Sequence, residues 1–385
     1  MTGLPPAPEC SCAGAGAESD PPGPAQSFLS VLPAGAAPSV APAPGRPPAR
    51  LSVNDYVNGV RGGDRGILAR AITLIESSSP EHQVRAQKVL QKLLPFTGRS
   101  RRLGITGVPG VGKSMLIEAL GCALCGQGLR VAVLAVDPTS TRSGGSILGD
   151  KTRMEQLCRQ PNAFIRPSPS GRTLGGVARK TRETMLLCEA AGFDVLIIET
   201  VGVGQSEVTV RSMVDFFLLL ILPGAGDELQ GIKKGIVEQA DALLITKADG
   251  ENRLRAEQAR QEYAMALHYL PANTPGWTTP VSLSSAVTGE SIPEFWQTVL
   301  RFYGEFEPNG RIAARRSEQA IQWLHDLVRE TLTTRFYGHP QVRKTQPEIE
   351  AALLRGELTA PQAARALLEL AGHDPKAPAG AAPAR

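Results

Sequence analysis

The sequence has little of what marks several specialised classes of protein. Only 5% of its residues are aromatic, and a chain of 385 residues with only six cysteines can bury a core without disulfide staples, which excludes a disulfide-stapled miniprotein. Its net charge of +4 includes no block of about five basic residues, so the charge pattern of a nucleic-acid-binding surface is absent. The most apolar run, Phe216–Leu222, is far shorter than the ~20 residues of a membrane-spanning helix. We expect a globular protein with neither nucleic acid nor membrane as a partner.

The amino-terminal residues also lack the features of targeting signals. The first arginine is Arg46, which fits neither the basic start of a secretory signal nor an Arg-rich mitochondrial transit peptide. We therefore expect a cytoplasmic protein with reduced cysteines. Cys122 and Cys125 have CxxC spacing, but no second pair or histidine is nearby, which favours buried thiols over a metal site.

Composition and periodicity divide the chain into five segments. We predict disordered tails rich in Ala, Pro and Gly at 1–50 and 373–385, a helical cap at 51–98, a main domain at 99–308 and a helical arm at 309–372. In the cap, Asp64 and the Ser79-Pro80 pair are typical helix starts.

The arm carries one clear apolar stripe, formed by Ile321, Leu324, Leu327, Val328 and Leu332. A further helix pair is predicted from about Pro347 to Leu370, with a start at Thr359. Self-association and packing of the arm on the chain's own sheet would give the same pattern, so both interpretations remain open at this point.

The main domain alternates short apolar runs with helical patterns. The runs are Leu103–Thr106, Val131–Val136, Phe164–Arg166, Val195–Glu199, Phe216–Leu222, Ala242–Thr246 and Val281–Leu283. Several are continuous Val, Ile and Leu, as expected of parallel strands that helices cover on both faces. We predict an α/β fold with a doubly wound, mainly parallel sheet, whose ligands bind beyond the carboxyl ends of the strands.

A glycine-rich loop follows the first of these strands. It reads Gly107-Val108-Pro109-Gly110-Val111-Gly112-Lys113-Ser114, and a helix begins at about Met115. In a GxxxxGK[ST] loop between strand and helix, backbone N–H groups surround phosphate oxygens and the helix N-terminus adds partial positive charge. Lys113 is expected to reach the β- and γ-phosphates, and the Ser114 hydroxyl to bind Mg²⁺. The loop predicts a nucleoside triphosphate site.

A second motif indicates which base is bound. Thr246-Lys247-Ala248-Asp249 follows a late strand and matches the [NT]KxD turn of GTPases. The Asp249 carboxylate would accept hydrogen bonds from N1–H and the N2 amino group of guanine, which adenine does not present, and the Lys247 stem would pack on the ring. Ser284-Ser285-Ala286 resembles the loop that contacts the guanine O6. A solvated turn is the alternative, and the motif favours GTP over ATP.

Three acids follow strands or loops at the same predicted edge. Glu199 ends the strand before Gly202 and would hold Mg²⁺ directly or through water, while Asp137 follows the second strand. Asp150 follows the Ser- and Gly-rich loop 139–149, which is suited to ordering around γ-phosphate and metal. Asp150 could instead be only a helix cap. The candidate catalytic residues are Lys113, Asp137, Asp150 and Glu199, and the candidate metal ligands are Ser114, Asp137, Asp150 and Glu199.

Four long segments resemble the MeaB/ArgK/MMAA family of P-loop GTPases: Val136–Met154, Gly171–Val195, Glu199–Glu207 and Glu228–Ile236. The resemblance covers approximately Asn54 to Leu370. It implies a homodimer formed through a carboxyl-terminal helical arm. It also implies a chaperone of methylmalonyl-CoA mutase and related cobalamin enzymes, which uses GTP, GDP and Mg²⁺ to gate adenosylcobalamin loading, protection and reactivation. A cob(I)alamin adenosyltransferase is a further expected partner.

The resemblance also implies residue roles. Asp137, Asp150 and Glu199 match the family's Mg²⁺-site and catalytic carboxylates. The loop Gly226–Lys234 resembles a switch that couples nucleotide state to the mutase, through Asp227, Gln230, Lys233 and Lys234. Two residues depart from the common pattern, because Met115 stands where Thr is common and Thr246 where Asn is.

The sequence offers no clear arginine finger. Arg142, Arg153 and Arg172 are candidates, although solvated roles are favoured for each, and the position of Gln205 makes a water-orienting role doubtful. We therefore expect slow GTP hydrolysis that a partner accelerates.

Two alternatives and the identity of the client remain open. A metallochaperone GTPase would have to rely on Cys10 and Cys12, without a nearby histidine. The Thr246–Asp249 turn argues against an ATP-dependent transport-system kinase. The client could be methylmalonyl-CoA mutase or a related acyl-CoA mutase.

Overall fold

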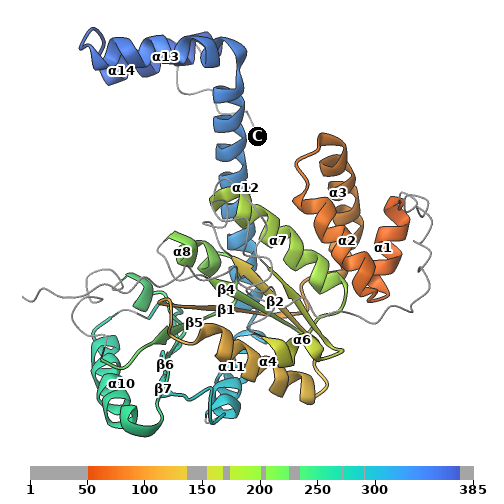
Figure 1. Ribbon diagram of the computed structural model, residues 1–385, viewed down its shortest axis with the longest axis vertical. Helices are drawn as coiled ribbons and strands as arrows, with labels where there is room; N and C mark the ends of the chain where they lie inside the picture. The colour runs from red at the N-terminus through yellow and green to blue at the C-terminus, as the bar shows by residue number, and fades with distance from the viewer. Residues whose placement is uncertain are drawn as a thin grey trace, which may run out of the picture. The chain divides into compact units, whose positions relative to one another are not determined.

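The computed structural model describes residues 51–136, 154–167, 174–200, 205–224, 235–270, 272–289 and 291–372. Its centre is a seven-stranded sheet in the order β3-β2-β4-β1-β5-β6-β7, in which every neighbouring pair is parallel (Figure 1). The strands are β1 (Arg101–Gly107), β2 (Val131–Val136), β3 (Ala163–Arg166), β4 (Val195–Thr200), β5 (Phe216–Ile221), β6 (Ala242–Ile245) and β7 (Val281–Leu283). Each predicted strand is confirmed, with ends that differ by a residue or two. The doubly wound α/β fold is therefore confirmed.

Helices cover both faces of this sheet (Figure 1). One face carries α4 (Lys113–Gly126), α6 (Glu155–Arg159) and α11 (Ile292–Phe306); the other carries α7 (Leu174–Ala190) and α8 (Gln205–Arg211). η2 (Gly250–Asn252) and α10 (Arg253–His268) follow β6, and α10 packs on β6 and β7. In β4, Val195 and Ile197 face the first core, and Leu196 and Ile198 face the second. Because both faces are buried, the strand is apolar at every one of these positions.

The amino-terminal helices pack on the outer side of α7. They are α1 (Val53–Arg61), α2 (Arg65–Glu76), α3 (Pro80–Leu93) and the short η1 (Leu94–Phe96). Both predicted starts are confirmed: Asp64 Oδ1 accepts from the backbone N–H of Gly66 (2.8 Å) and Ile67 (3.0 Å), and Ser79 precedes Pro80 at the first helical position.

The carboxyl-terminal segment forms α12 (Arg311–Gly338), α13 (Pro340–Leu354) and α14 (Ala360–Leu370), and α13 and α14 pack on each other. The predicted cap Thr359 is confirmed by its hydrogen bond with the N–H of Gln362. The predicted start near Pro347 is wrong, because α13 begins at Pro340 and Pro347 lies inside it. Pro340 fits the first helical position, where the missing N–H has no helical partner, whereas Pro347 removes only one hydrogen bond and the helix continues.

The described cysteines lie in helices and form no disulfide with one another. Cys125 and Cys188 are buried as predicted, and burial raises the pKa of the Cys125 thiol to about 11, whereas Cys122 and Cys158 are only half-buried. Cys10, Cys12 and the two predicted disordered tails lie outside the described residues.

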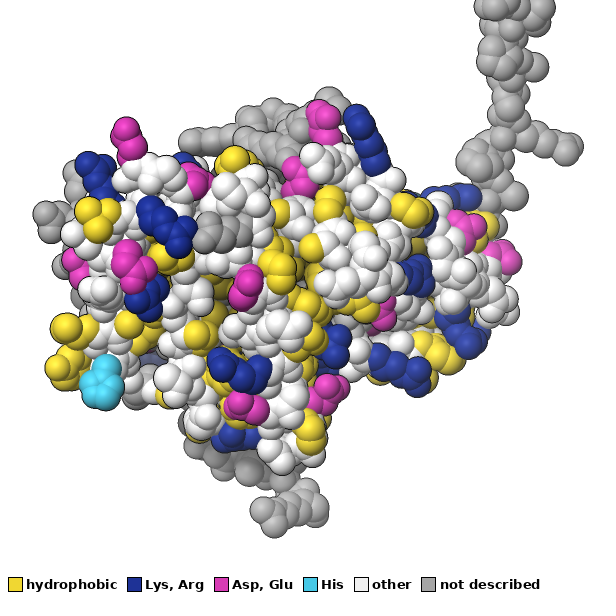
Figure 2. Space-filling model, turned by 90° about the horizontal axis from the view of Figure 1, so that it is seen from below, with side chains coloured by type: hydrophobic (Ala, Val, Ile, Leu, Met, Phe, Trp, Pro, Cys, Tyr) yellow, Lys and Arg dark blue, Asp and Glu magenta, His cyan; other side chains and the backbone are white. Residues whose placement is uncertain are grey.

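No helix among the described residues is long and apolar enough to cross a membrane. Figure 2 shows the surface from below the view of Figure 1, with Lys and Arg side chains interspersed among Asp and Glu. Hydrophobic side chains show in small groups between them. The net charge of +4 is not gathered into a patch of one sign on this face.

Candidate nucleotide site

The predicted phosphate loop, Gly107–Ser114, leaves the carboxyl end of β1 and leads directly into α4. Gly112 has a φ of 99°, in the left-handed region that favours glycine. At Gly107, with a φ of 153°, an added Cβ would lie 2.7 Å from the carbonyl oxygen of Leu220. Val111 is fully buried and anchors the loop on the core, while Pro109 and Gly110 are exposed. The loop therefore presents backbone outward at the edge where ligands of such sheets bind.

Lys113 lies against this loop. Its Nζ donates to the carbonyl oxygens of Gly107 (2.8 Å) and Val108 (3.1 Å), and the residue is only 8% exposed. These contacts hold the ammonium group at the first turn of α4, where the partial positive charge of the helix N-terminus adds to it. The combination suits an anionic phosphate group.

Ser114, at the start of α4, lies beside Glu199, near the end of β4. The Ser114 Oγ donates to Glu199 Oε1 at 3.2 Å, and Glu199 lies near the carboxyl end of β4, which pairs with β1. A hydroxyl and a carboxylate oxygen are the donor types that Mg²⁺ takes, so these two predicted ligands fit that ion. The other predicted ligands, Asp137 and Asp150, lie outside the described residues.

A buried polar network that the sequence analysis did not identify lies beneath these residues. Thr106 Oγ1 is 2.7 Å from Thr200 Oγ1 and donates to Glu207 Oε1 at 3.3 Å. The three side chains come from β1, β4 and α8, and all are at most 3% exposed. The only signal in the sequence is a threonine at or next to the end of each of two neighbouring strands. The network connects the base of the phosphate loop, the Glu199 strand and α8.

The predicted guanine-binding turn follows β6, on the other side of β1. Thr246 Oγ1 donates to the carbonyl oxygen of Val111 at 2.8 Å, so this turn is tied to the phosphate loop. Lys247 is exposed with a φ of 55°. Thr246, which departs from the common Asn of this motif, therefore links the turn directly to the phosphate loop.

Asp249 is held by the loop after β7. Its Oδ2 accepts a hydrogen bond from Ser285 Oγ, and the N–H of Ala248 donates to the carbonyl oxygen of Ser284 at 3.2 Å. Ser284 and Ser285 are buried, and Ala286 is half-buried beside them. A carboxylate oriented by a neighbouring hydroxyl is suited to accept the paired N–H groups of guanine.

The structure therefore brings most of the predicted binding residues to one edge of the sheet. Met115 is half exposed at the start of α4, beside the loop. Several predicted residues lie outside the described parts of the chain: the switch residues Asp227, Gln230, Lys233 and Lys234, the candidate arginines Arg142, Arg153 and Arg172, and Gly202. Gln205 opens α8, and its side chain is not described.

A phosphate loop, a neighbouring hydroxyl–carboxylate pair and an [NT]KxD turn at the carboxyl ends of parallel strands define a P-loop GTPase. The model of one family, methylmalonyl-CoA mutase-associated GTPase MeaB, matches residues 68–341. The chain belongs to the MeaB family and is a GTP hydrolase.

Individual relatives agree with this assignment. The chain is 55% identical to a putative GTPase of Caulobacter vibrioides, over 84% of this chain and 98% of that one. It is 45% identical to the mouse methylmalonic aciduria type A homolog, named as mitochondrial, over 82% of this chain and 79% of that one. A solved structure titled LAO/AO transport system kinase is similar with a TM-score of 0.68 and 37% identity, over 83% and 97% of the two chains.

Proposed function

We propose that this GTPase is a chaperone that gates the loading, protection and reactivation of adenosylcobalamin in methylmalonyl-CoA mutase or a related acyl-CoA mutase. The observation that carries the proposal is the match of the mutase-associated family over residues 68–341, together with the nucleotide site described above. A cob(I)alamin adenosyltransferase would supply the cofactor. We expect the protein to act in the cytoplasm.

Hydrolysis at this site consists mainly of positioning and charge stabilisation. Water attacks the γ-phosphate in line, which requires little covalent chemistry from the protein. Lys113, now bonded to Gly107 and Val108 carbonyls, would donate to the phosphate oxygens, together with the N–H groups of the loop. Asp249 and Lys247 would hold the guanine, and Ser284–Ala286 would close the pocket around it.

Ser114 and Glu199 would hold Mg²⁺, and we propose Asp137 and Asp150 as further carboxylates at that ion. When bound, Mg²⁺ would neutralise charge that develops on the transferring phosphoryl group. The buried Thr106–Thr200–Glu207 network would keep β1, β4 and α8 in register around this pair. We expect the intrinsic turnover of this site to be slow.

We further propose that coupling to the mutase runs through the loop Gly226–Lys234, with Asp227, Gln230, Lys233 and Lys234 as contact or switch residues. The proposed homodimer would form through α12, α13 and α14. Its support is an exposed apolar stripe on α12, where Ile321, Leu324, Val328 and Leu332 are 48–58% exposed. Exposed apolar side chains at this helical spacing are typical of a helix–helix interface.

The test uses purified full-length protein and purified methylmalonyl-CoA mutase. GTP turnover is measured alone and with increasing mutase, and transfer of adenosylcobalamin to the apo-mutase is followed with GTP, GDP or a non-hydrolysable GTP analogue. We expect turnover well below ~10 s⁻¹ alone, a rise of at least about tenfold with mutase, and cofactor transfer that depends on the nucleotide.

A Lys233→Glu, Lys234→Glu variant should lose stimulation by the mutase while its basal GTP turnover is kept. Equal turnover with and without each acyl-CoA mutase tested, combined with nucleotide-independent cofactor loading, would contradict the chaperone proposal. ATP hydrolysis as fast as GTP hydrolysis would instead support a transport-system kinase.

A further inference from the structure

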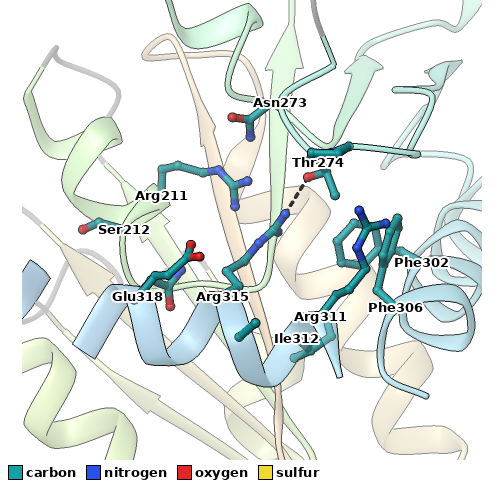
Figure 3. A pocket seen from close by; sticks show the side chains of 13 residues that line it. Arg211, Ser212, Asn273, Thr274, Phe302, Phe306, Arg311, Ile312, Arg315 and Glu318 are labelled. Carbon is teal, nitrogen blue, oxygen red and sulfur yellow. Dashed lines mark hydrogen bonds between the residues drawn. The ribbon is translucent and has the colours of Figure 1, made fainter. Parts of the chain in front are cut away.

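An arginine-lined pocket opens at the amino-terminal edge of the sheet, opposite the edge that holds the phosphate loop. Its volume is about 460 Å³, within the range of small-molecule sites. The end of α8, the loop before β7, α11 and the first turns of α12 form its walls (Figure 3). The site described above uses none of its lining residues.

Three arginines, Arg211, Arg311 and Arg315, line this pocket from two different helices. Figure 3 shows the guanidinium groups of Arg211 and Arg315 pointing toward each other. Arg315 also donates to Thr274 Oγ1 at 2.6 Å, and the Arg311 guanidinium lies over the Phe306 ring at 4.9 Å. Guanidinium groups that line one cavity favour an anion in it wherever nearby carboxylates do not balance their charge.

The acidic groups nearby do not balance these charges. Arg211 and Arg315 share one carboxylate, since Asp241 Oδ2 lies 3.3 Å from Arg211 Nη1 and 3.7 Å from an Arg315 nitrogen. Asp241 is fully buried and also accepts from the N–H of Phe217 and the Thr274 hydroxyl. Asp241 lies behind the pocket wall, and Glu318 is the acid that lines the pocket itself. Three arginines against two carboxylates leave one positive charge.

The half-buried Arg211 side chain is not fully hydrogen-bonded. Its Nη1 is buried and makes no hydrogen bond of good geometry within the described residues. Burial lowers the pKa of Arg211; Asp241 opposes this effect, and the neighbouring Arg315 charge adds to it. A bound anion beside the exposed part of these guanidinium groups would reduce the repulsion between Arg211 and Arg315.

We propose that this pocket binds the phosphate group of a small organic phosphate monoester, held by Arg211, Arg311 and Arg315. The cavity is larger than a bare phosphate needs, so the organic part of the ligand fits beside Asn273 and Ser212. The first turn of α12 adds the partial positive charge of a helix N-terminus. Such a ligand would contact both α8, which leads from the nucleotide site, and α12. The inference does not depend on the mutase proposal.

The test is calorimetric titration of the full-length protein with glycerol 3-phosphate, in saturating GDP and Mg²⁺ so that the phosphate loop is occupied. We expect saturable binding. Arg311→Gln should weaken it about tenfold, as loss of one charge-assisted hydrogen bond does, and Glu318→Gln should tighten it severalfold. Both side chains are exposed, so these variants are expected to fold.

Arg301→Gln is the matched control, because it removes the same charge from a side chain that lies over Trp277 and does not line the pocket. Its affinity should equal that of the wild type. No saturable binding, or equal weakening by Arg301→Gln and Arg311→Gln, would overturn the proposal. Tighter binding of succinate than of glycerol 3-phosphate would overturn the assignment to phosphate monoesters.

Discussion

At the scale of single residues, Thr246 shows how one hydroxyl can connect two binding loops. Its Oγ1 donates to the Val111 carbonyl at 2.8 Å, and the Ile221 carbonyl oxygen lies 3.2 Å away, while the residue is only 6% exposed. The guanine-binding turn is therefore fixed to the phosphate loop from inside the protein. Because the contact is buried, its loss cannot be made good by water.

Thr246→Val replaces this hydroxyl with a methyl group of similar size. We expect the free energy of unfolding, measured in urea without nucleotide, to fall by about 1–2 kcal/mol, because the Val111 carbonyl loses this buried hydrogen bond, while the Ile221 carbonyl keeps the backbone N–H of residue 246. GTP affinity should fall as well. Thr246→Ser keeps the hydroxyl and should retain most of the GTP affinity. A Val variant that matches the wild type in both measurements would show that the contact is unimportant.

The binding residues that could be predicted are those whose spacing along the chain is itself the signal. Lys113, Ser114 and Asp249 lie in short motifs that follow recognisable strands, and the structure places all three near the carboxyl ends of those strands. Thr106 and Glu207 could not be predicted, because they are 101 positions apart and meet only through the pairing of β1 with β4 and the packing of α8. Local patterns carry no information about such contacts.

At the scale of elements, α12 has two different faces. One packs toward α7 and the sheet, with Arg182 over the Trp323 ring at 5.5 Å and Gln319 donating to the Val214 carbonyl at 2.8 Å. The other carries the exposed stripe that the sequence predicted. The stripe was therefore recognisable from periodicity alone, whereas the polar face that packs on the domain was not.

Leu324→Asp tests whether this stripe forms the proposed dimer. We expect sedimentation to show a dimer for the wild type and a monomer for the variant, because a charge would be buried without a partner in the interface. Thr333→Asp adds the same charge at an exposed position outside the stripe and should remain dimeric. A wild-type monomer at all concentrations, or a dimer that survives Leu324→Asp, would contradict a stripe-mediated dimer.

The junction between α12 and the domain is built around a buried carboxylate. Asp215 is fully buried and accepts from Arg316 Nε at 2.8 Å and Nη2 at 2.6 Å, and from the Tyr303 hydroxyl at 2.7 Å. Burial and the Asp215 charge raise the pKa of Tyr303 well above its usual value, so this hydroxyl remains a donor. These bonds hold the start of the arm in place.

Arg316→Met should lower the free energy of unfolding by about 3–5 kcal/mol, because it leaves the Asp215 charge buried without its cation. The double change Asp215→Asn, Arg316→Met removes the stranded charge and should cost less. Thermal and urea unfolding give the comparison. A single variant within about 1 kcal/mol of the wild type would mean that Asp215 is not ionised or finds another partner.

At the scale of the whole molecule, the sheet has two different edges: the one formed by the carboxyl ends of its parallel strands and the one formed by their amino ends. The predicted nucleotide-binding residues lie at the carboxyl ends of the strands, where ligands of doubly wound sheets bind. The amino edge holds the arm junction and the arginine pocket, which are made by charged residues far apart in sequence, such as Asp215 and Arg316. The first edge was predictable because topology and motifs coincide there. The second could not be predicted, since nothing in the sequence around an isolated charged residue indicates that its side chain is buried.

The central claim is that Asp249 selects guanine at this site, and the most direct measurement is kcat/KM for GTP and XTP in the wild type and in Asp249→Asn. The wild type should prefer GTP strongly. In the variant, kcat/KM for GTP should fall by about 10²-fold or more, because an amide cannot accept both guanine N–H groups, while XTP should become the better substrate. An Asp249→Asn protein that still prefers GTP as the wild type does would contradict the account.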